Sequence, residues 1–119
     1  MIPFGTPGGD VQIQAMVQCL LNVVLWNMDP QQAVEAPRFA SYSFPDSFEP
    51  HRTYPGRLMI ETRIASDTFD HLKSLGHQVD SWPDWTWKAG AVCLIYVDQK
   101  NKIQISGADP RRPAYALGW

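Results

Sequence analysis

The sequence predicts an α+β fold, in which helices dominate the first third of the chain and strands dominate the rest. Apolar residues recur every three or four positions from Ile13 to Val24, which is the period of a helix face. From Arg57 to Ile64 they alternate with mostly polar residues, which is the period of a strand. Because helices precede most of the strands, layered α+β packing is favoured over a parallel doubly wound sheet.

The first predicted helix begins after Asp10, a good N-cap residue, and runs to about Asn27. Apolar residues with helical spacing mark one face of this helix: Ile13, Met16, Val17, Leu20, Leu21 and Val24. The other side is partly apolar too, with Val11, Ala15, Cys19 and Val23. The helix should therefore be substantially buried.

A second, short helix is predicted from about Pro30 to Ala36. Asp29 is placed to cap it, Pro30 suits its first turn, and Pro37 ends it. The next stretch, residues 38–55, is rich in aromatic side chains and interrupted by prolines. It is predicted to be an ordered loop or a set of short extended pieces, packed onto the body of the protein.

The second half of the chain is predicted to contain four strands and one helix. The strand Arg57–Ile64 comes first, and Ser66 or Asp67 then caps a helix that Gly76 ends. The remaining strands are Gln78–Trp82, the apolar central strand Ala91–Val97 and its hairpin partner Lys102–Ser106.

Length and charge exclude several classes of partner. A chain of 119 residues makes one domain at most, so 1–119 is treated as a single domain. The net charge is −2 and basic residues are scattered, so we expect no nucleic-acid partner and no membrane partner. No apolar run reaches the ~20 residues that a membrane span needs, and no signal peptide is visible.

The cysteines and histidines do not predict a metal site. Cys19 and Cys93 lie in apolar segments and are interpreted as small buried side chains, not as a disulfide or metal pair. The histidines are His51, His71 and His77, and they lack metal-ligand spacing. We therefore expect no metal and no cofactor.

The segment Gly5-Thr6-Pro7-Gly8-Gly9 runs directly into the first predicted helix. A tight turn at a helix N-terminus leaves backbone N–H groups unpaired, with the positive end of the helix dipole behind them. Such groups can bind an anion or a developing oxyanion. A plain turn with an N-cap is the other interpretation of this segment.

The ordered set of motifs along the chain resembles the C-terminal part of the small subunit of the γ-glutamyltranspeptidase family. The resemblance covers the chain from Gly5 to its end and rests on five segments: Gly5–Gly9, Gln18–Val24, Met28–Pro30, Ala33–Phe39 and Gly107–Pro113. It implies an N-terminal-nucleophile hydrolase fold with four αββα layers. It also implies a precursor that cleaves itself, after which the new N-terminal Thr attacks a γ-glutamyl amide.

In that family the paired glycines of the turn supply the oxyanion hole, and they fall here on Gly8 and Gly9. The nucleophile and most substrate contacts lie upstream of the turn in the family, so we expect this chain to carry one wall of the site and to be inactive alone. Thr6 is the nearest hydroxyl but has no free amine, so its expected role is local hydrogen bonding in the turn. The resemblance further implies two partners, a γ-glutamyl substrate and the N-terminal portion of the same protein. We also expect a second copy of the chain as a partner, because the Asp10–Asn27 helix is apolar on more than one side and the Ala91–Val97 strand has almost no polar face.

Several questions stay open from the sequence. The segment Asp10–Gln14 departs from the pattern of well-known family members, which leaves open whether glutathione is the substrate and whether hydrolysis or transfer dominates. The compartment is open between bacterial cytoplasm and periplasm. The alternative function is a non-catalytic binding or assembly module that uses the aromatic loop and a tryptophan-rich loop, and a Thr-containing self-cleavage segment upstream would decide against it.

Three further features have structural interpretations. Trp82, Trp85 and Trp87 favour packing or an oligomer interface over stacking on a sugar or nucleobase. The segment Asp109-Pro110-Arg111 is expected to hold a structural ion pair. Glu35 lies at a helix C-terminus, where the dipole disfavours it, so a partner such as Arg38 or Arg111 is expected.

Overall fold

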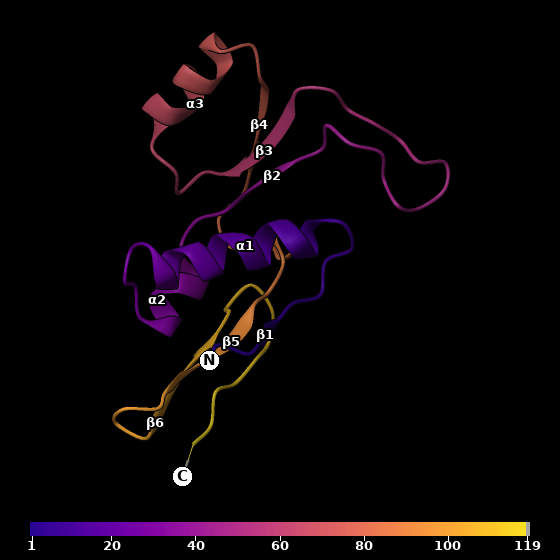
Figure 1. Cartoon of the computed structure of the whole chain (residues 1–119). Coiled ribbons are helices and arrows are strands. Elements are labelled where there is room, and N and C mark those ends of the chain that lie inside the picture. The colour runs from indigo at the N-terminus through magenta and orange to yellow at the C-terminus, as the bar shows by residue number, and fades with distance from the viewer. Residues whose placement is uncertain (119) are drawn as a thin grey trace. The chain divides into compact units, whose positions relative to one another are not determined.

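Helices and antiparallel strands are both present in the computed structural model, which describes residues 1–118, so the predicted α+β class is confirmed (Figure 1). The chain divides into two units. One combines Met1–Ala36 with the chain from Trp87 onward, and the other is Pro37–Thr86. The expectation that residues 1–119 form one domain stays a prediction.

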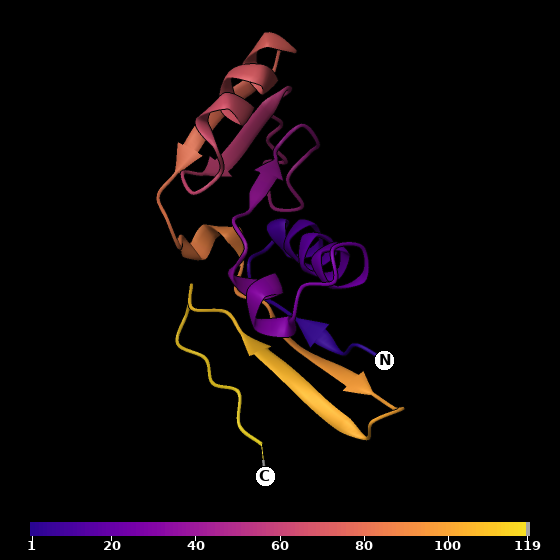
Figure 2. The ribbon, with the colours of Figure 1, turned by 90° about the vertical axis from the view of Figure 1, so that its left-hand side faces the viewer.

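The first unit contains a three-stranded antiparallel sheet in the order β1-β5-β6. Its elements are the strand β1 (Phe4–Gly5), the helices α1 (Val11–Val24) and α2 (Pro30–Glu35), the 3₁₀ helix η1 (Trp87–Ala89) and the strands β5 (Cys93–Asp98) and β6 (Ile103–Ala108). The long hairpin of β5 and β6 is visible in Figure 2, with α2 against it. The central position predicted for the Ala91–Val97 strand is confirmed.

Helix α1 is fully buried along only one of the two apolar sides that the sequence indicates. Its buried residues are Val11, Ala15, Cys19 and Val23. Ile13, on the predicted face, is 71% exposed, and Val17 and Val24 are about half exposed. The predicted burial is therefore confirmed for the side with the smaller residues and wrong for the side of Ile13, because α1 contacts α2, β1 and η1 and leaves Ile13 in solvent. Asp10 occupies the N-cap position, but its side chain makes no capping hydrogen bond.

Helix α2 begins and ends where its flanking residues predict. Asp29 Oδ1 accepts a hydrogen bond of 2.9 Å from Gln32 N, and Gln32 Oε1 accepts one of 3.3 Å from Asp29 N. This reciprocal capping box, together with Pro30 in the first turn, fixes the start of the helix. The role of Asp29 is confirmed, and that of Gln32 was missed.

The second unit, Pro37–Thr86, contains a sheet in the order β2-β3-β4 and one helix. Its elements are β2 (Phe39–Ser41), β3 (Arg57–Glu61), α3 (Ser66–Ser74) and β4 (Gln78–Trp82). Strand β2 pairs antiparallel with β3, whereas β3 and β4 are parallel and are connected through α3. The long loop between β2 and β3 extends from the sheet in Figure 1.

The start of α3 differs from the prediction. Its N-cap is Ala65, which has extended backbone angles, and Ser66 is already helical, so neither Ser66 nor Asp67 caps the helix. Asp67 instead lies in the first turn, where a carboxylate is favoured by the helix dipole. The end of the helix before Gly76 agrees with the prediction.

The two cysteines differ in exposure, and both are free thiols. Cys19 is buried in α1 as expected, but Cys93 is exposed, so that prediction is wrong. Successive side chains of a strand point to opposite faces. In β5 the face of Leu94 is buried, and Cys93 lies on the opposite face. Within residues 1–118, no helix combines the length and the apolar character needed to cross a membrane.

Candidate functional site

The turn between β1 and α1 has a backbone that requires glycine. Gly8 has a φ of +139° and Gly9 a φ of +56°, both in the range that side chains disfavour. The carbonyls of the two glycines begin the helix: Gly8 O accepts a hydrogen bond of 3.2 Å from Val11 N, and Gly9 O accepts one of 3.1 Å from Gln12 N. The turn therefore leads directly into α1.

The N–H groups of Gly8 and Gly9 donate no hydrogen bond to any residue of the described chain, 1–118. Gly9 is exposed and Gly8 half-buried. Both groups lie at the N-terminus of a 14-residue helix, where the dipole adds partial positive charge. Two such donors can bind an anion or stabilise an oxyanion. The arrangement is compatible with the role expected for Gly8 and Gly9, which stays a prediction.

The hydroxyl of Thr6 forms two hydrogen bonds that stabilise the turn. Thr6 Oγ1 donates to Pro7 O at 2.8 Å and accepts from Ala91 N at 2.7 Å. Because its hydrogen is committed to the Pro7 carbonyl, the hydroxyl is not set up as a nucleophile. The expected role of Thr6 in local hydrogen bonding is confirmed, and its contact with Ala91 was missed.

Gly90 is a residue of this site that the sequence did not reveal. Its φ is +81°, and a Cβ there would lie 3.0 Å from Ala15 Cβ and 3.0 Å from Thr6 Oγ1. The only available signal was the run of small residues Ala89-Gly90-Ala91. Gly90 lets the segment before β5 approach both the turn and α1.

A buried ion pair supports the same unit. Arg111 Nη1 lies 3.1 Å from Asp109 Oδ1, and both side chains are fully buried, so the predicted structural ion pair is confirmed. For Glu35 the structure gives a hydrogen bond of 2.7 Å from Gln31 Nε2. The arginine partner predicted for Glu35 stays a prediction.

The three tryptophans each pack against a different side chain. Trp82 is buried, with its ring at 83° to that of Tyr42 and 6.5 Å between centroids. The guanidinium carbon of Arg63 lies over Trp85, 3.6 Å from its ring centroid. Trp87 has Arg112 5.4 Å from its ring centroid. Packing is confirmed for the buried Trp82, whereas Trp85 and Trp87 contact arginines and remain exposed, and an oligomer interface stays a prediction.

The environment of Tyr42 also has an electrostatic consequence. Burial raises the pKa of the Tyr42 hydroxyl, an effect that the nearby positive charge of Arg57 partly offsets and Asp46 adds to. The Arg57 guanidinium lies 5.8 Å from the Tyr42 ring centroid and 5.3 Å from that of Tyr54. Tyr42 therefore stays protonated at neutral pH and acts as a packing residue.

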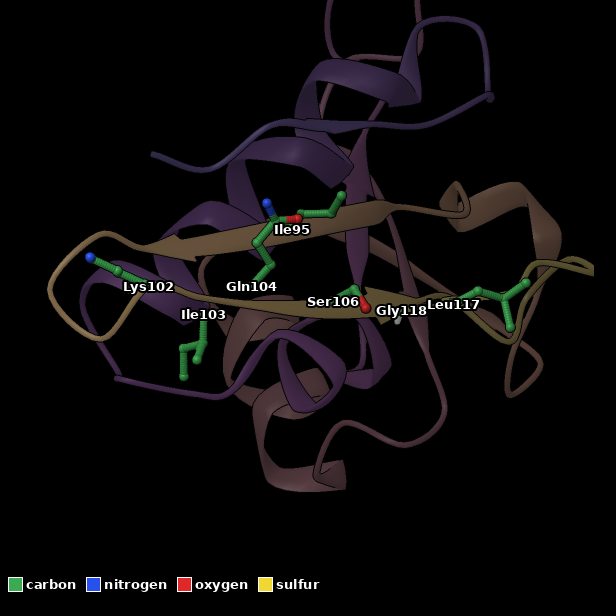
Figure 3. Close-up of a pocket in the computed structure, with 7 residues that line it drawn as sticks. All are labelled: Ile95, Lys102, Ile103, Gln104, Ser106, Leu117 and Gly118. Atoms are coloured by element: carbon green, nitrogen blue, oxygen red, sulfur yellow. The ribbon is translucent and has the colours of Figure 1, made fainter.

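A separate cavity of about 760 Å³ lies on the hairpin of β5 and β6 (Figure 3). Its lining residues are Ile95, Lys102, Ile103, Gln104, Ser106, Leu117 and Gly118. It contains no residue of the Pro-Gly-Gly turn and no pair of acid and base groups. In the part of the chain that the structure describes, no cluster of His, Cys, Asp or Glu could hold a metal ion.

Comparison with known proteins gives one consistent family. A family model described as Gamma-glutamyltranspeptidase matches residues 1–119. The chain is 31% identical over 118 residues to the "Glutathione hydrolase-like YwrD proenzyme" of Bacillus subtilis, covering 98% of this chain and 21% of that protein.

Solved structures agree with this match. The structure of LmbA2991HD has a TM-score of 0.86 at 35% identity, over 92% of this chain and 20% of that one. A cephalosporin acylase from Bacillus halodurans has a TM-score of 0.76 at 26% identity, over 92% of this chain and 18% of that one. Solved γ-glutamyltranspeptidases share the α+β fold as well, with TM-scores of 0.76 and 0.74. The chain thus spans about a fifth of the length of the curated relative.

Proposed function

This chain belongs to the γ-glutamyltranspeptidase family, and from that premise we propose that it supplies the oxyanion hole of an amidohydrolase acting on γ-glutamyl amides. The single observation that carries the proposal is the pair of free N–H groups of Gly8 and Gly9, which no residue of the described chain occupies. Both belong to a turn that Thr6 and Gly90 hold in place.

The two N–H groups would act on the oxygen of the scissile amide. When a nucleophile attacks the carbonyl carbon, that oxygen gains negative charge, and donors already aimed at it lower the barrier. The oxyanion then re-forms the carbonyl and the C–N bond breaks, while the leaving amine takes the proton that the nucleophilic hydroxyl gave up. Water or an acceptor amine next attacks the acyl-enzyme, which breaks the ester bond and returns a proton to the hydroxyl. The nucleophilic Thr is proposed to lie outside this chain, because the hydroxyl of Thr6 is engaged at both its donor and acceptor sides.

The substrate class is proposed as γ-glutamyl amides such as glutathione. The name of the Bacillus subtilis relative supports this choice. A competing class is other acyl amides, because a cephalosporin acylase has a similar structure at 26% identity. Parallel kcat/KM measurements on a γ-glutamyl anilide and on an acyl amide without the glutamyl group would separate the two classes.

The test removes one N–H without adding a side chain. The experiment uses a full-length family protein whose matching segment is this chain. Gly9 is replaced by its hydroxy-acid analogue, which exchanges the amide bond between Gly8 and Gly9 for an ester bond. We expect kcat to fall about a hundredfold, the usual effect of one lost oxyanion donor. Proline at position 9 is unsuitable, because its ring fixes φ near −65° whereas Gly9 has a φ of +56°.

The same ester exchange at Gly118 is the matched control. A Cβ built on Gly118 would meet no atom within 4 Å, so its surroundings are open. We expect the control to keep its kcat, and circular dichroism should show that both proteins are folded. A folded Gly9 ester with the kcat of the parent protein would contradict the oxyanion role.

A second candidate function is an assembly module. It is favoured by the apolar side chains that α1 exposes, including Ile13 at 71%. Trp85 and Trp87 add exposed aromatic surface, at 41% and 56%. Such surface commonly marks protein interfaces. Under this proposal the partner is a second copy of the chain or the N-terminal portion of a family-length protein.

A further inference from the structure

The Pro-Gly-Gly turn is hydrogen-bonded, through Thr6, to a segment that is distant in sequence. Ala91 N donates a 2.7 Å hydrogen bond to Thr6 Oγ1, across 85 positions of the chain. The same oxygen donates to Pro7 O at 2.8 Å. One hydroxyl thus connects the peptide just before Gly8 to the segment that enters β5. Strand pairing of Gly5 with Cys93 fixes the chain on the other side of Thr6.

Gly90 sets how closely the two segments approach. A Cβ at Gly90 would lie 3.0 Å from Thr6 Oγ1 and 3.6 Å from Pro7 O. On its other side it would lie 3.0 Å from Ala15 Cβ, and Ala15 is completely buried in α1. A Cβ at Gly8 would in turn lie 3.5 Å from Gly90 Cα. The turn, Gly90 and α1 are therefore in contact through their smallest residues.

A turn with two adjacent glycines needs such support. Glycine has more backbone freedom than any other residue, so Gly8 and Gly9 do not fix the direction of their own N–H groups. Donors stabilise a transition state efficiently only when they are oriented before the reaction. An error of about 1 Å in such a position can cost about a hundredfold in rate.

We propose that Thr6 and Gly90 are positioning residues that fix the direction of the Gly8 and Gly9 N–H groups. Thr6 acts through the hydrogen bond that its hydroxyl accepts from Ala91 N, and Gly90 acts through the absence of a side chain. Neither residue touches the substrate. The consequence for catalysis rests on the proposed function, whereas the consequence for the geometry of the turn does not.

The first arm of the test uses nuclear magnetic resonance on the 119-residue chain. Thr6→Val keeps the shape of the side chain but removes both hydrogen bonds, and Thr6→Ser retains them. We expect Thr6→Val to shift the amide resonances of Gly8 and Gly9 and to speed exchange of the Ala91 amide about tenfold, as expected for one lost hydrogen bond. Thr6→Ser should restore both, and Thr68→Val on the exposed surface of α3 is the matched control.

Gly90→Ala is the second variant, and it approaches the turn from the other side. The added methyl group must displace Thr6 or α1, so we expect the Gly8 and Gly9 resonances to shift while Gly118→Ala leaves them unchanged. Circular dichroism shows whether Thr6→Val folds. If it does not, Gly90→Ala alone tests the positioning role. If both variants fold and the Gly8 and Gly9 resonances stay at their original positions, the positioning role is overturned.

The second arm measures kinetics in the full-length family protein that contains this chain. Thr6→Val should lower kcat by about tenfold or more with little change in KM, and Thr6→Ser should restore it. A merely structural role of Thr6 would lower the amount of folded enzyme, without a fall in kcat at unchanged KM per folded molecule and without recovery of that kcat in Thr6→Ser. If Thr6→Val displaces the glycine amides but leaves kcat unchanged, the oxyanion proposal fails while the geometric inference stands.

Discussion

Arg111 and Asp109 form a fully buried ion pair, with Arg111 Nη1 3.1 Å from Asp109 Oδ1. Arg111 Nη1 also donates to Val34 O at 2.9 Å, and its Nη2 donates to Ala36 O at 3.0 Å. The other oxygen of Asp109 accepts from Val92 N at 2.9 Å. The pair therefore joins the C-terminal end of α2 to the residue that precedes β5.

Removing the arginine should destabilise the chain strongly. In Arg111→Met the Asp109 carboxylate stays buried without its cation, and the carbonyls of Val34 and Ala36 lose donors. Breaking a buried pair in this way costs about 3–5 kcal/mol. Urea unfolding monitored by circular dichroism measures the loss.

The neighbouring arginine is the control for that prediction. Arg112 is only half-buried and lies 5.4 Å from the ring centroid of Trp87. A partly exposed contact of this kind is worth about 0.5–1 kcal/mol, so Arg112→Met should cost no more than that. Equal losses for the two variants would contradict the special importance of Arg111.

Gly107 lies where β6 touches the backbone of α2. A Cβ there would overlap the carbonyl group of Pro30 and lie 3.0 Å from Gln31 N. These are backbone atoms, which cannot rotate away, so Gly107→Ala should cost about 3 kcal/mol or more. At Gly5 the same substitution meets no atom within 4 Å. Thermal unfolding should separate the two variants clearly, and a Gly107→Ala protein as stable as Gly5→Ala would show that β6 can move away from α2.

The turn of the β5–β6 hairpin should depend on pH through Asp98. Its carboxylate accepts hydrogen bonds from Lys100 N at 3.0 Å and from Asn101 N at 3.1 Å. The hydrogen bonds from Asn101, first from its backbone and then from its side chain, lower the pKa of Asp98 below the ordinary value of 3.8. A depressed pKa in the folded state means that the stabilisation is present above pH 3.8 and is lost as the pH falls through the folded value.

The downward shift of the Asp98 pKa can be measured at the hairpin itself. The amide resonances of Lys100 and Asn101 should titrate with a midpoint below 3.8, and in Asp98→Ala they should show no such step. The difference in hairpin protection between the two proteins should shrink as the pH falls below that midpoint. A midpoint above 3.8 would mean that burial or repulsion dominates at Asp98.

Local signals predicted most of the secondary structure. Strand β4 has the bounds that the sequence indicated, and α2 lies between Asp29 and Pro37, because caps and prolines act on neighbouring residues. The side of α1 that is buried could not be predicted. Both of its sides carry apolar residues, and what decides between them is the close approach of Gly90 to Ala15, which no local pattern encodes.

The same distinction holds for the candidate site. The turn before α1 was predicted from its adjacent glycines, which are a local signal, whereas the oxyanion role of Gly8 and Gly9 was implied by the family resemblance. The hydrogen bond between Thr6 and Ala91 joins positions 85 apart, and it arises only when β1 pairs with β5. Contacts of this kind become visible only in the folded chain.

The 119-residue chain should not hydrolyse a chromogenic γ-glutamyl anilide. The reason is that Thr6, the hydroxyl of the turn, donates to Pro7 O and accepts from Ala91 N, so it lacks an activating base. Release of the coloured amine is the measurement. Turnover that co-purifies with the chain and disappears in Thr6→Ala would contradict the prediction and place the nucleophile in the turn.

The exposed face of α1 predicts that the isolated chain associates. Ile13, Val17 and Val24 are exposed by 71%, 48% and 50%, at positions that share one side of the helix, and Leu25 and Trp26 follow at 62% each. Contiguous apolar surface of this kind drives association. Light scattering at micromolar concentration should therefore give a mass above that of one chain.

Charges on this face should return the chain to a monomer. In the double variant Ile13→Lys and Val17→Lys, two like charges would have to be buried in the contact, which costs far more than the apolar area returns. Leu75→Lys is the matched control, because Leu75 is 63% exposed but lies just beyond α3, outside that face. If the unmodified chain is a monomer and also fails to bind a hydrophobic dye, the exposed face of α1 does not drive association in water and the prediction is wrong. If Leu75→Lys dissociates the oligomer and the α1 variant does not, the contact lies in the other unit.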